Sequence, residues 1–329
     1  MDLNKINETK HKELSLGVDL GGSKINIALV DNKGSIIKNV KKPTYANKGK
    51  DYIIDNIKQG IYDIIISSGV TIEDLLGIGI GIPGQIDIKR GIVHSAPNLP
   101  GWEGVQICRI LREEFHIPVI LENDANAAAW GENTFGIARG VKNMVCLTLG
   151  TGIGGGLIFE GKIYHGHNFG AGEVGHIIVN KDGPRCHCGG VGCLETFSSA
   201  TGIRDRISEK INKIRKISTE SLPDLNNIGL AEIFKRARQG DPLFKDIVDD
   251  AIEYLGVGIT TLVNLLNPEM IVLVGGIANE GEKILLPIKR FVFKRAMKVM
   301  LADLKIVLGV LQGQAGVIGA AALLWEKEE

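Results

Sequence analysis

The sequence predicts an α/β protein of two domains, and three observations lead to this expectation. Segments typical of β-strands alternate with segments typical of helices along most of the chain. The length of 329 residues exceeds one average domain, and a hydrophobic content of 44% is enough for two cores. In addition, one supersecondary unit occurs twice.

The repeated unit is a strand that enters a glycine-rich turn and returns as a hairpin. In the first copy the apolar run 14–20 enters the turn at Gly21, and alternating residues from 25 onward predict the returning strand. In the second copy the run 144–149 enters a turn at Gly150. The two turns lie about 129 residues apart, too far for a solenoid repeat. We therefore expect duplicated halves that face each other across a cleft.

The other elements are expected from apolar periodicity and from turn residues. We expect strands over 35–40, 75–84, 118–123, 157–159, 270–276 and 304–311, a hairpin over 86–93, a loop over 218–229, and helices over about 50–69, 102–115, 124 onward, 198–217, 241–266, 282–298 and 314–328. The helix 241–266 should begin with Asp241 as N-cap and Pro242 at the first helical position.

Composition excludes some classes of partner. Lysine plus arginine equals aspartate plus glutamate at 38 each, which argues against a nucleic-acid groove. Basic clusters at 234–240 and 287–298 are interpreted as solvated helix faces.

The polar N-terminus carries no secretory signal, and no apolar run approaches the roughly 18 residues of a membrane span. We expect a cytoplasmic protein whose five cysteines stay thiols or metal ligands.

Two segments, 79–84 and 150–155, fit the pattern G-x-G-x-x-G. Neither runs into a helix, so neither is expected to bind a dinucleotide, and no P-loop motif occurs. A glycine turn between strands can still present backbone N–H groups to an anion. Two such turns could hold a nucleotide triphosphate, although the glycines could also serve only to make tight hairpins.

Polar side chains accompany these turns. Asp19 stands at the end of the first strand, where a carboxylate would repel phosphate unless Mg²⁺ lay between them. Ser23, Lys24 and Thr151 could supply hydroxyl and ammonium groups to phosphate.

Three cysteines, Cys186, Cys188 and Cys193, lie within eight positions. Three thiolates and one imidazole make a closed tetrahedral Zn²⁺ site of the structural type. His187 would point away from its neighbours in extended chain, whereas His176 could return through an intervening turn. The alternative is a set of free buried thiols.

The motifs, taken in order, resemble those of the ROK family (repressor, open reading frame, kinase) in the actin-like ATPase superfamily. They are DLGGSK (19–24), GIGIPGQID (79–87), APNLPGW (96–102), ENDANAAAWGE (122–132), LTLGTGIGGGLI (147–158), GEVGH (172–176), CHCGGVGCLE (186–195) and LVGG (273–276). Ser23 replaces the more usual Thr and keeps the hydroxyl. The resemblance implies a two-domain actin-like ATPase (ribonuclease H-like) fold with an active-site cleft between the domains. Residues 1–122 with 313–329 would form the smaller domain, and 123–312 the larger one with an inserted zinc-binding loop.

The resemblance also implies roles for particular residues. Asp124, which from its position alone reads as a helix N-cap, becomes the catalytic base, and His176 becomes the fourth zinc ligand. Sugar binding would fall to Gly84, Asn98, Asn123, Asp124, Glu173, His176 and Glu195. Nucleotide binding would fall to Asp19, Gly21, Gly22, Ser23, Lys24, Gly150, Thr151, Gly152, Gly275 and Gly276.

The implied activity is an ATP- and Mg²⁺-dependent hexose kinase of carbohydrate metabolism that phosphorylates the 6-hydroxyl, with glucose as the first expectation. N-acetylmannosamine, N-acetylglucosamine, fructose, mannose and allose are alternative acceptors, and polyphosphate is an alternative donor. Family members form homodimers or homotetramers.

A transcriptional repressor needs an N-terminal DNA-binding domain, and about 13 residues before the first strand are too few for one. A pure actin-like ATPase would not need the sugar and cysteine motifs.

Overall fold

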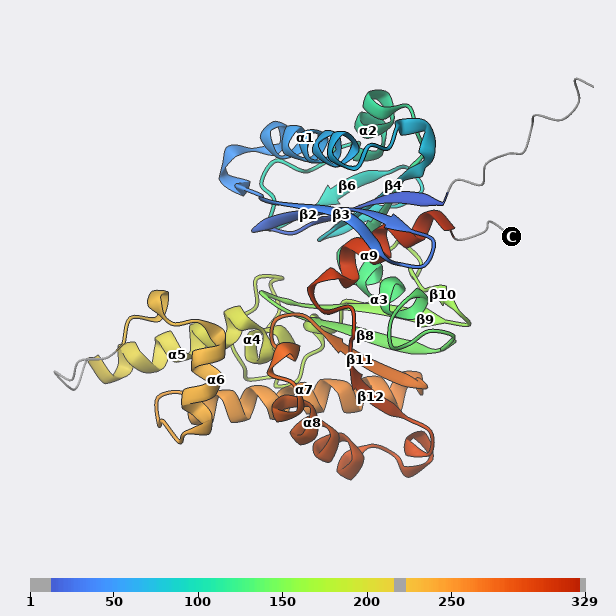
Figure 1. Cartoon of the computed structure of the whole chain (residues 1–329). Helices are drawn as coiled ribbons and strands as arrows, with labels where there is room; N and C mark the ends of the chain where they lie inside the picture. Colours follow the sequence, from blue (N-terminus) through green and yellow to red (C-terminus); the bar gives the residue numbers. More distant parts are fainter. Residues whose placement is uncertain (1–12, 216–222, 326–329) are drawn as a thin grey trace, which may run out of the picture. The chain divides into compact units, whose positions relative to one another are not determined.

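The structure of the chain, a computed structural model, describes residues 13–215 and 223–325 (Figure 1). The chain divides into two compact units. Unit 1 comprises the described residues within Met1–Ala127 and Gly316–Glu329, and unit 2 comprises Ala128–Ala315. The division falls within helix α3 (Asp124–Thr134).

Unit 1 is built on a mixed five-stranded sheet in the order β3-β2-β1-β4-β7. Its strands are β1 (Leu14–Leu20), β2 (Lys24–Asp31), β3 (Ile36–Pro43), β4 (Leu75–Ile82) and β7 (Val119–Asn123). The first three pair antiparallel, whereas β1, β4 and β7 run parallel. A small separate sheet pairs β5 (Gln85–Asp87) with β6 (Ile92–Ser95).

Helices cover both faces of this sheet. Helices α1 (Lys50–Ser68) and α2 (Ile107–Phe115) lie over one face (Figure 1). The backbone of α9 (Ala315–Ala322) packs directly on β1 and β4, because Gly17 and Gly79 carry no Cβ that would clash with it. Strands covered in this way are buried on both faces, which explains the continuous apolar runs of β1 and β4.

Unit 2 repeats the plan, with a mixed five-stranded sheet in the order β10-β9-β8-β11-β12. Its strands are β8 (Met144–Leu149), β9 (Ile153–Phe159), β10 (Lys162–Ile163), β11 (Met270–Val274) and β12 (Lys305–Leu308). Its helices are α4 (Leu194–Ser198), α5 (Ala200–Arg215), α6 (Leu230–Arg238), α7 (Lys245–Leu266) and α8 (Glu282–Arg295). The predicted α/β class and the internal repeat are confirmed, since two antiparallel hairpins occupy equivalent places in two sheets of the same order.

Two expected helices begin later than predicted. Helix α2 begins at Ile107 rather than at 102, because Gly101 and Gly104 adopt positive φ, and Trp102 is buried in the core of unit 1 instead. Helix α7 begins at Lys245, so Pro242 lies in the preceding turn.

Asp241 is not the N-cap of α7, which is Phe244. The Asp241 carboxylate is instead paired with Arg236, 2.7 Å from Nη2, and accepts a 2.9 Å bond from the N–H of Leu243. The expected N-cap was wrong: the Asp241 carboxylate binds Leu243 and the nearby Arg236 in the turn that precedes the helix.

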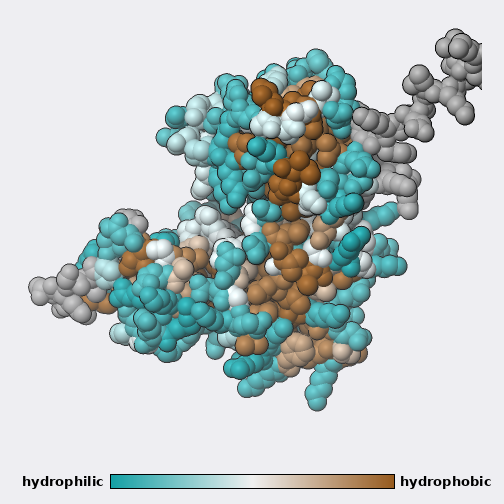
Figure 2. Space-filling view, viewed as in Figure 1, coloured by the Kyte–Doolittle hydropathy of each residue, from teal (hydrophilic) through white to brown (hydrophobic). Residues whose placement is uncertain are grey.

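Other differences are small. The expected helix 198–217 is divided at Ser199, which is extended, into α4 and α5. Positions 216–217 and part of the expected loop 218–229 lie outside the described residues. None of the helices in the described ranges is long and apolar enough to cross a membrane. Figure 2 shows hydrophilic side chains over much of the surface drawn there, with apolar ones among them. Among the described residues, the exposed apolar ones include Leu286, Phe293 and Met297.

Candidate functional site

The carboxyl ends of the parallel strands in unit 1 bring several predicted residues to one edge of the sheet. Asp19 on β1 is in register with Gly81 on β4, and Gly81 is in register with Glu122 on β7. A Cβ on Gly81 would lie 3.5 Å from the Cα of Asp124. Asp19 near the end of β1 and Asp124 directly after β7, distant in sequence, therefore lie at the same edge of one sheet, on the two strands that flank β4.

Asp19 is mostly buried at this edge. Burial raises the pKa of its carboxyl to about 6, against the opposing charge of Lys24. The helix α9 starts beside it, since a Cβ on Gly316 would lie 3.0 Å from the Asp19 Cγ. Because burial makes this carboxyl costly to ionise, a bound cation would stabilise its ionised form.

The turn after β1 carries Gly21, Gly22, Ser23 and Lys24. The N–H of Gly21 donates to the carbonyl of Lys24 at 2.9 Å, which closes the turn, and Ser23 and Lys24 are exposed. Asn98 packs against it, because a Cβ on Gly22 would lie 3.1 Å from the Asn98 Cβ. Four predicted nucleotide residues and one predicted sugar residue thus share one corner of unit 1.

Sequence reasoning missed Thr44, a fully buried residue that holds this turn. Its hydroxyl donates to the carbonyl of Gly21 at 2.7 Å, and its N–H donates to the carbonyl of Ser23 at 3.0 Å. No local pattern marks Thr44, because its partners lie more than twenty residues earlier in the chain.

The start of α3 shows which residue caps this helix. The N-cap is Asn123, whose Oδ1 accepts bonds from the N–H groups of Ala125 at 2.9 Å and Asn126 at 3.3 Å. Asp124 is the first helical residue and its Oδ1 accepts a bond from the N–H of Ala125. A carboxylate here is favoured by the helix dipole, and capping by Asn123 leaves Asp124 suited to another role.

Neighbouring groups fix Asn123. The buried carboxylate of Glu122 accepts a 2.8 Å bond from the N–H of Asn123 and a 3.0 Å bond from the side chain of Asn126. The Asn123 amide donates at 3.4 Å to the carbonyl of Gly84, whose φ of 104° suits glycine. Gly84 and Asn123, both predicted sugar ligands, thus lie side by side.

In unit 2 the second glycine turn, Gly150 to Gly152, joins β8 to β9. The N–H of Ala200 donates to the carbonyl of Gly150 at 2.9 Å, and the N–H of Thr201 donates to Thr151 at 3.3 Å, so the start of α5 fixes the turn. Thr151 is exposed. The turn is therefore accessible to solvent at Thr151, and the start of α5 holds its backbone in place.

Glu195 lies directly against this turn. It stands in the first turn of α4, and its Oε2 accepts a 2.8 Å bond from the N–H of Ile153. A Cβ on Gly152 would clash with the same carboxylate. A predicted sugar ligand and a predicted phosphate-binding turn are thus in direct contact.

The GEVGH segment packs on β9 through glycines. A Cβ on Gly172 or on Gly175 would clash with the backbone of β9. This close approach places Glu173 and His176, at the two ends of the short 3₁₀ helix Val174–His176, where Glu173 Oε2 lies 3.7 Å from His176 Nε2.

The cysteine cluster is formed by His176, Cys186, Cys188 and Cys193, whose ligand atoms all lie within 4.8 Å of one another. Cys188 Sγ lies 3.7 Å from Cys193 Sγ, and Cys186 Sγ lies 3.6 Å from His176 Nδ1. Metal bonds of about 2.3 Å to sulfur and about 2.0 Å to nitrogen give tetrahedral edges of about 3.8 Å and about 3.5 Å, so the donor set fits Zn²⁺. His187 is exposed and is not part of the cluster.

The thiol chemistry agrees with a metal site. Burial raises the pKa of Cys193 to about 12, and the neighbouring Cys188 thiol adds to the shift. Three thiols this close need a cation to be held as thiolates. Cys108, whose pKa burial raises to about 11, and the fully buried Cys146 lie elsewhere in the two cores.

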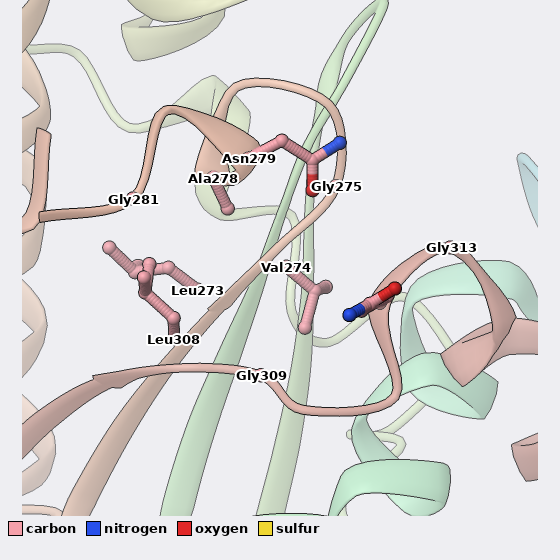
Figure 3. A pocket seen from close by; sticks show the side chains of 10 residues that line it. Leu273, Val274, Gly275, Ala278, Asn279, Gly281, Leu308, Gly309 and Gly313 are labelled. Carbon is pink, nitrogen blue, oxygen red and sulfur yellow. The ribbon is translucent and has the colours of Figure 1, made fainter.

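A pocket of about 450 Å³ lies at the ends of β11 and β12 in unit 2 (Figure 3). Leu273, Ala278 and Leu308 give it apolar walls, and Asn279 brings an amide. Gly275, with a φ of 97°, lines it, and Gly276 follows directly. Its volume lies within the range of small-ligand pockets.

The structure therefore brings the predicted residues together in three groups. Asp19, Gly21, Gly22, Ser23, Lys24, Gly84, Asn98, Asn123 and Asp124 gather at one edge of the unit 1 sheet; Gly150, Thr151, Gly152, Glu173, His176, Glu195 and the three cysteines gather in unit 2; Gly275 and Gly276 lie at the pocket of unit 2.

Comparison with known proteins places the chain in a family. The family model described as "ROK family" matches residues 15–327. The glucokinase of Halalkalibacterium halodurans is 37% identical over 315 residues, which are 95% of each chain. The xylose repressor of Caldicellulosiruptor bescii is 32% identical over 313 residues, 94% of this chain and 77% of the repressor.

Among solved structures, the chain is similar to a ROK family glucokinase from Streptomyces griseus in complex with glucose and AMPPNP. The TM-score is 0.78 at 33% identity, over 94% of this chain and 98% of that one. The likeness confirms the two-domain α/β fold with two mixed five-stranded sheets, and the match over nearly the whole length shows that this chain belongs to the ROK family.

Proposed function

We propose that the protein is an ATP-dependent hexose kinase with glucose as the preferred acceptor. The observation that carries the proposal is the contact of Glu195 with the glycine turn at Gly152, because it puts a carboxylate suited to sugar hydroxyls beside backbone suited to phosphate. The similarity to glucokinases, one of them crystallised with glucose and AMPPNP, supports the same chemistry.

The proposed reaction transfers the γ-phosphoryl group of ATP to the 6-hydroxyl of the sugar. Asp124 accepts the hydroxyl proton while the new O–P bond forms and the bond from the γ-phosphorus to the bridging oxygen of ADP breaks. In unit 1 the turn Gly21–Lys24 contributes backbone N–H groups and the Lys24 ammonium toward phosphate. Asp19 would hold Mg²⁺, which neutralises phosphate charge when bound.

In unit 2 we propose that Glu173, His176 and Glu195 bind sugar hydroxyls, that Gly150 to Gly152 bind phosphate, and that the pocket at Gly275 and Gly276 receives the nucleotide. The four-ligand cluster would hold a structural Zn²⁺. His176 Nδ1 faces the Cys186 thiol, which leaves Nε2 for a sugar hydroxyl. Cys193 immediately precedes α4, so a metal there would fix the start of the helix that carries Glu195.

The test is a panel of sugars with ATP and Mg²⁺, followed by coupled detection of ADP. We expect sugar-dependent ADP release, with the largest kcat/KM for glucose. A larger value for N-acetylmannosamine, N-acetylglucosamine, fructose or mannose would move the acceptor and keep the kinase. Sugar-independent ADP release would contradict the kinase assignment.

A second candidate is a sugar-responsive regulator, because the xylose repressor matches over 94% of this chain. Such a protein would bind sugar without releasing ADP, so the same panel with calorimetric sugar titration separates the two functions. A homodimer or homotetramer is proposed by analogy with the family, and sedimentation velocity measures it.

A further inference from the structure

Glu132, in the last turn of α3, is a buried carboxylate held entirely by backbone. Its side chain is 0% exposed, and no ion pair involves it within residues 13–215 and 223–325. Oε1 accepts a 2.9 Å bond from the N–H of Leu311, and Oε2 accepts bonds from Ile137 at 3.1 Å and Val310 at 3.3 Å. A buried charge is costly unless such bonds offset it, so three N–H groups aimed at one carboxylate indicate a built arrangement.

Two glycines approach the Glu132 carboxylate closely. A Cβ on Gly136, in the loop after α3, would clash with Oε2, and a Cβ on Gly309, after β12, would clash with Oε1. Two chain segments more than 170 residues apart therefore both lack a side chain where they meet Glu132.

The segment that Glu132 holds forms one wall of the pocket in unit 2. Leu308, Gly309, Gln312 and Gly313 line the pocket (Figure 3). Val310 and Leu311, the residues bonded to Glu132, lie between Gly309 and Gln312 in the sequence. The other wall comes from β11 and the residues after it.

The conformation of this wall is not one that its sequence favours. Gln312 has a φ of 50°, in the left-handed region that non-glycine residues rarely adopt. Val310 is 52% exposed, so the wall has little apolar burial of its own at that residue. A strained, exposed segment persists when neighbouring structure fixes it, and the bonds from Glu132 supply that fixation immediately before Gln312.

We infer that Glu132 is a positioning residue for nucleotide binding, which acts by holding the segment 309–313 in its pocket-forming conformation. The inference rests on the proposed function, because it takes the pocket as the nucleotide site. Without the anchor the segment samples other conformations, and the apparent Kd rises in inverse proportion to the fraction that stays competent.

The test compares wild type with Glu132→Gln and Glu132→Asp. Glu132→Gln keeps the shape but replaces one acceptor oxygen with an amide that cannot accept, and Glu132→Asp keeps the charge but withdraws it by one methylene. Calorimetric titration with AMPPNP at a temperature where every variant is folded should give a Kd about 10-fold higher for Glu132→Gln. Glu132→Asp should lie between, and the sugar KM at saturating ATP should stay within about 2-fold of wild type.

A matched control separates positioning from general stability. Ile207→Ala truncates a fully buried residue of α5, which is not a pocket residue, and should lower Tm without changing the AMPPNP Kd. Should Glu132→Gln fail to fold, Glu132→Asp carries the test alone. An unchanged AMPPNP Kd in the folded Glu132 variants, with only Tm lowered, would overturn the role of Glu132 and leave the kinase standing. A wild-type protein that binds no AMPPNP would overturn both.

Discussion

The carboxylate of Glu195 accepts a 2.8 Å hydrogen bond from the backbone N–H of Ile153, across 42 residues of sequence. This bond joins the helix that follows the cysteine cluster to the glycine turn between β8 and β9. The zinc-type cluster, Glu195 and the turn are thus one connected arrangement within unit 2.

Gly152→Ala tests this connection, because the added Cβ would clash with Glu195 Oε2. The carboxylate must move or lose its bond to Ile153, so we expect kcat/KM for the sugar to fall by about 10-fold or more. Steady-state kinetics measure it. Gly229→Ala is the matched control, because its Cβ would meet open space, and it should behave as wild type. Equal kinetics for both variants would contradict the arrangement.

Cys193→Ser should remove the proposed Zn²⁺. Purified wild type is expected to carry about one zinc per chain by elemental analysis, and the variant much less. Since Cys193 precedes the helix of Glu195, the sugar KM should rise with the loss of metal. Cys108→Ala, in the core of unit 1, should keep the zinc. Wild type without zinc but with full activity would reject the assignment.

Asp124→Asn should lower kcat by about 10²- to 10⁴-fold while leaving Tm close to wild type. The reason is that Asn123 supplies the helix cap, so the change removes a base rather than a capping group. Asp51→Asn, at an exposed carboxylate in the first turn of α1, is the control and should retain activity. Near-normal turnover in Asp124→Asn would show that another group takes the proton.

Thr44→Val removes the hydroxyl that donates to Gly21 and leaves that carbonyl without this partner. We expect a loss of about 1–2 kcal/mol in the free energy of unfolding, together with a several-fold rise in the KM for ATP. Thr44→Ser keeps the hydroxyl and should recover the KM. If Val and Ser variants had the same KM for ATP, Thr44 would stabilise the fold without shaping the turn.

Asp19→Asn should stabilise the metal-free protein at neutral pH. Burial raises the pKa of Asp19 to about 6 from an ordinary value of 3.8, so the folded state favours the protonated acid. Protonation of Asp19 therefore stabilises the folded state fully below about pH 4, and this stabilisation is lost as pH rises through about 6.

Urea unfolding without added Mg²⁺ measures this dependence. The free energy of unfolding of Asp19→Asn, relative to wild type, should rise by about 1–3 kcal/mol between pH 4.5 and pH 7.5. A pH-independent difference for Asp19→Asn would contradict the burial argument.

Much of the fold followed from local patterns. Alternation and apolar runs around Gly21 and Gly150 predicted two hairpins, and two hairpins occupy equivalent places in the two sheets. The cysteine spacing predicted a metal-type cluster, and the three thiols do converge. These features depend on neighbours in sequence, which a pattern can report.

Tertiary structure decided the remainder. It confirmed His176 as the fourth member of the cluster, began α7 at Lys245 rather than at 241, and made Asn123 rather than Asp124 the cap of α3. It also gave Thr44 and Glu132 their partners, 23 and up to 179 residues away. Such partners are set by how distant segments pack, and no local periodicity encodes which buried donor will meet which acceptor.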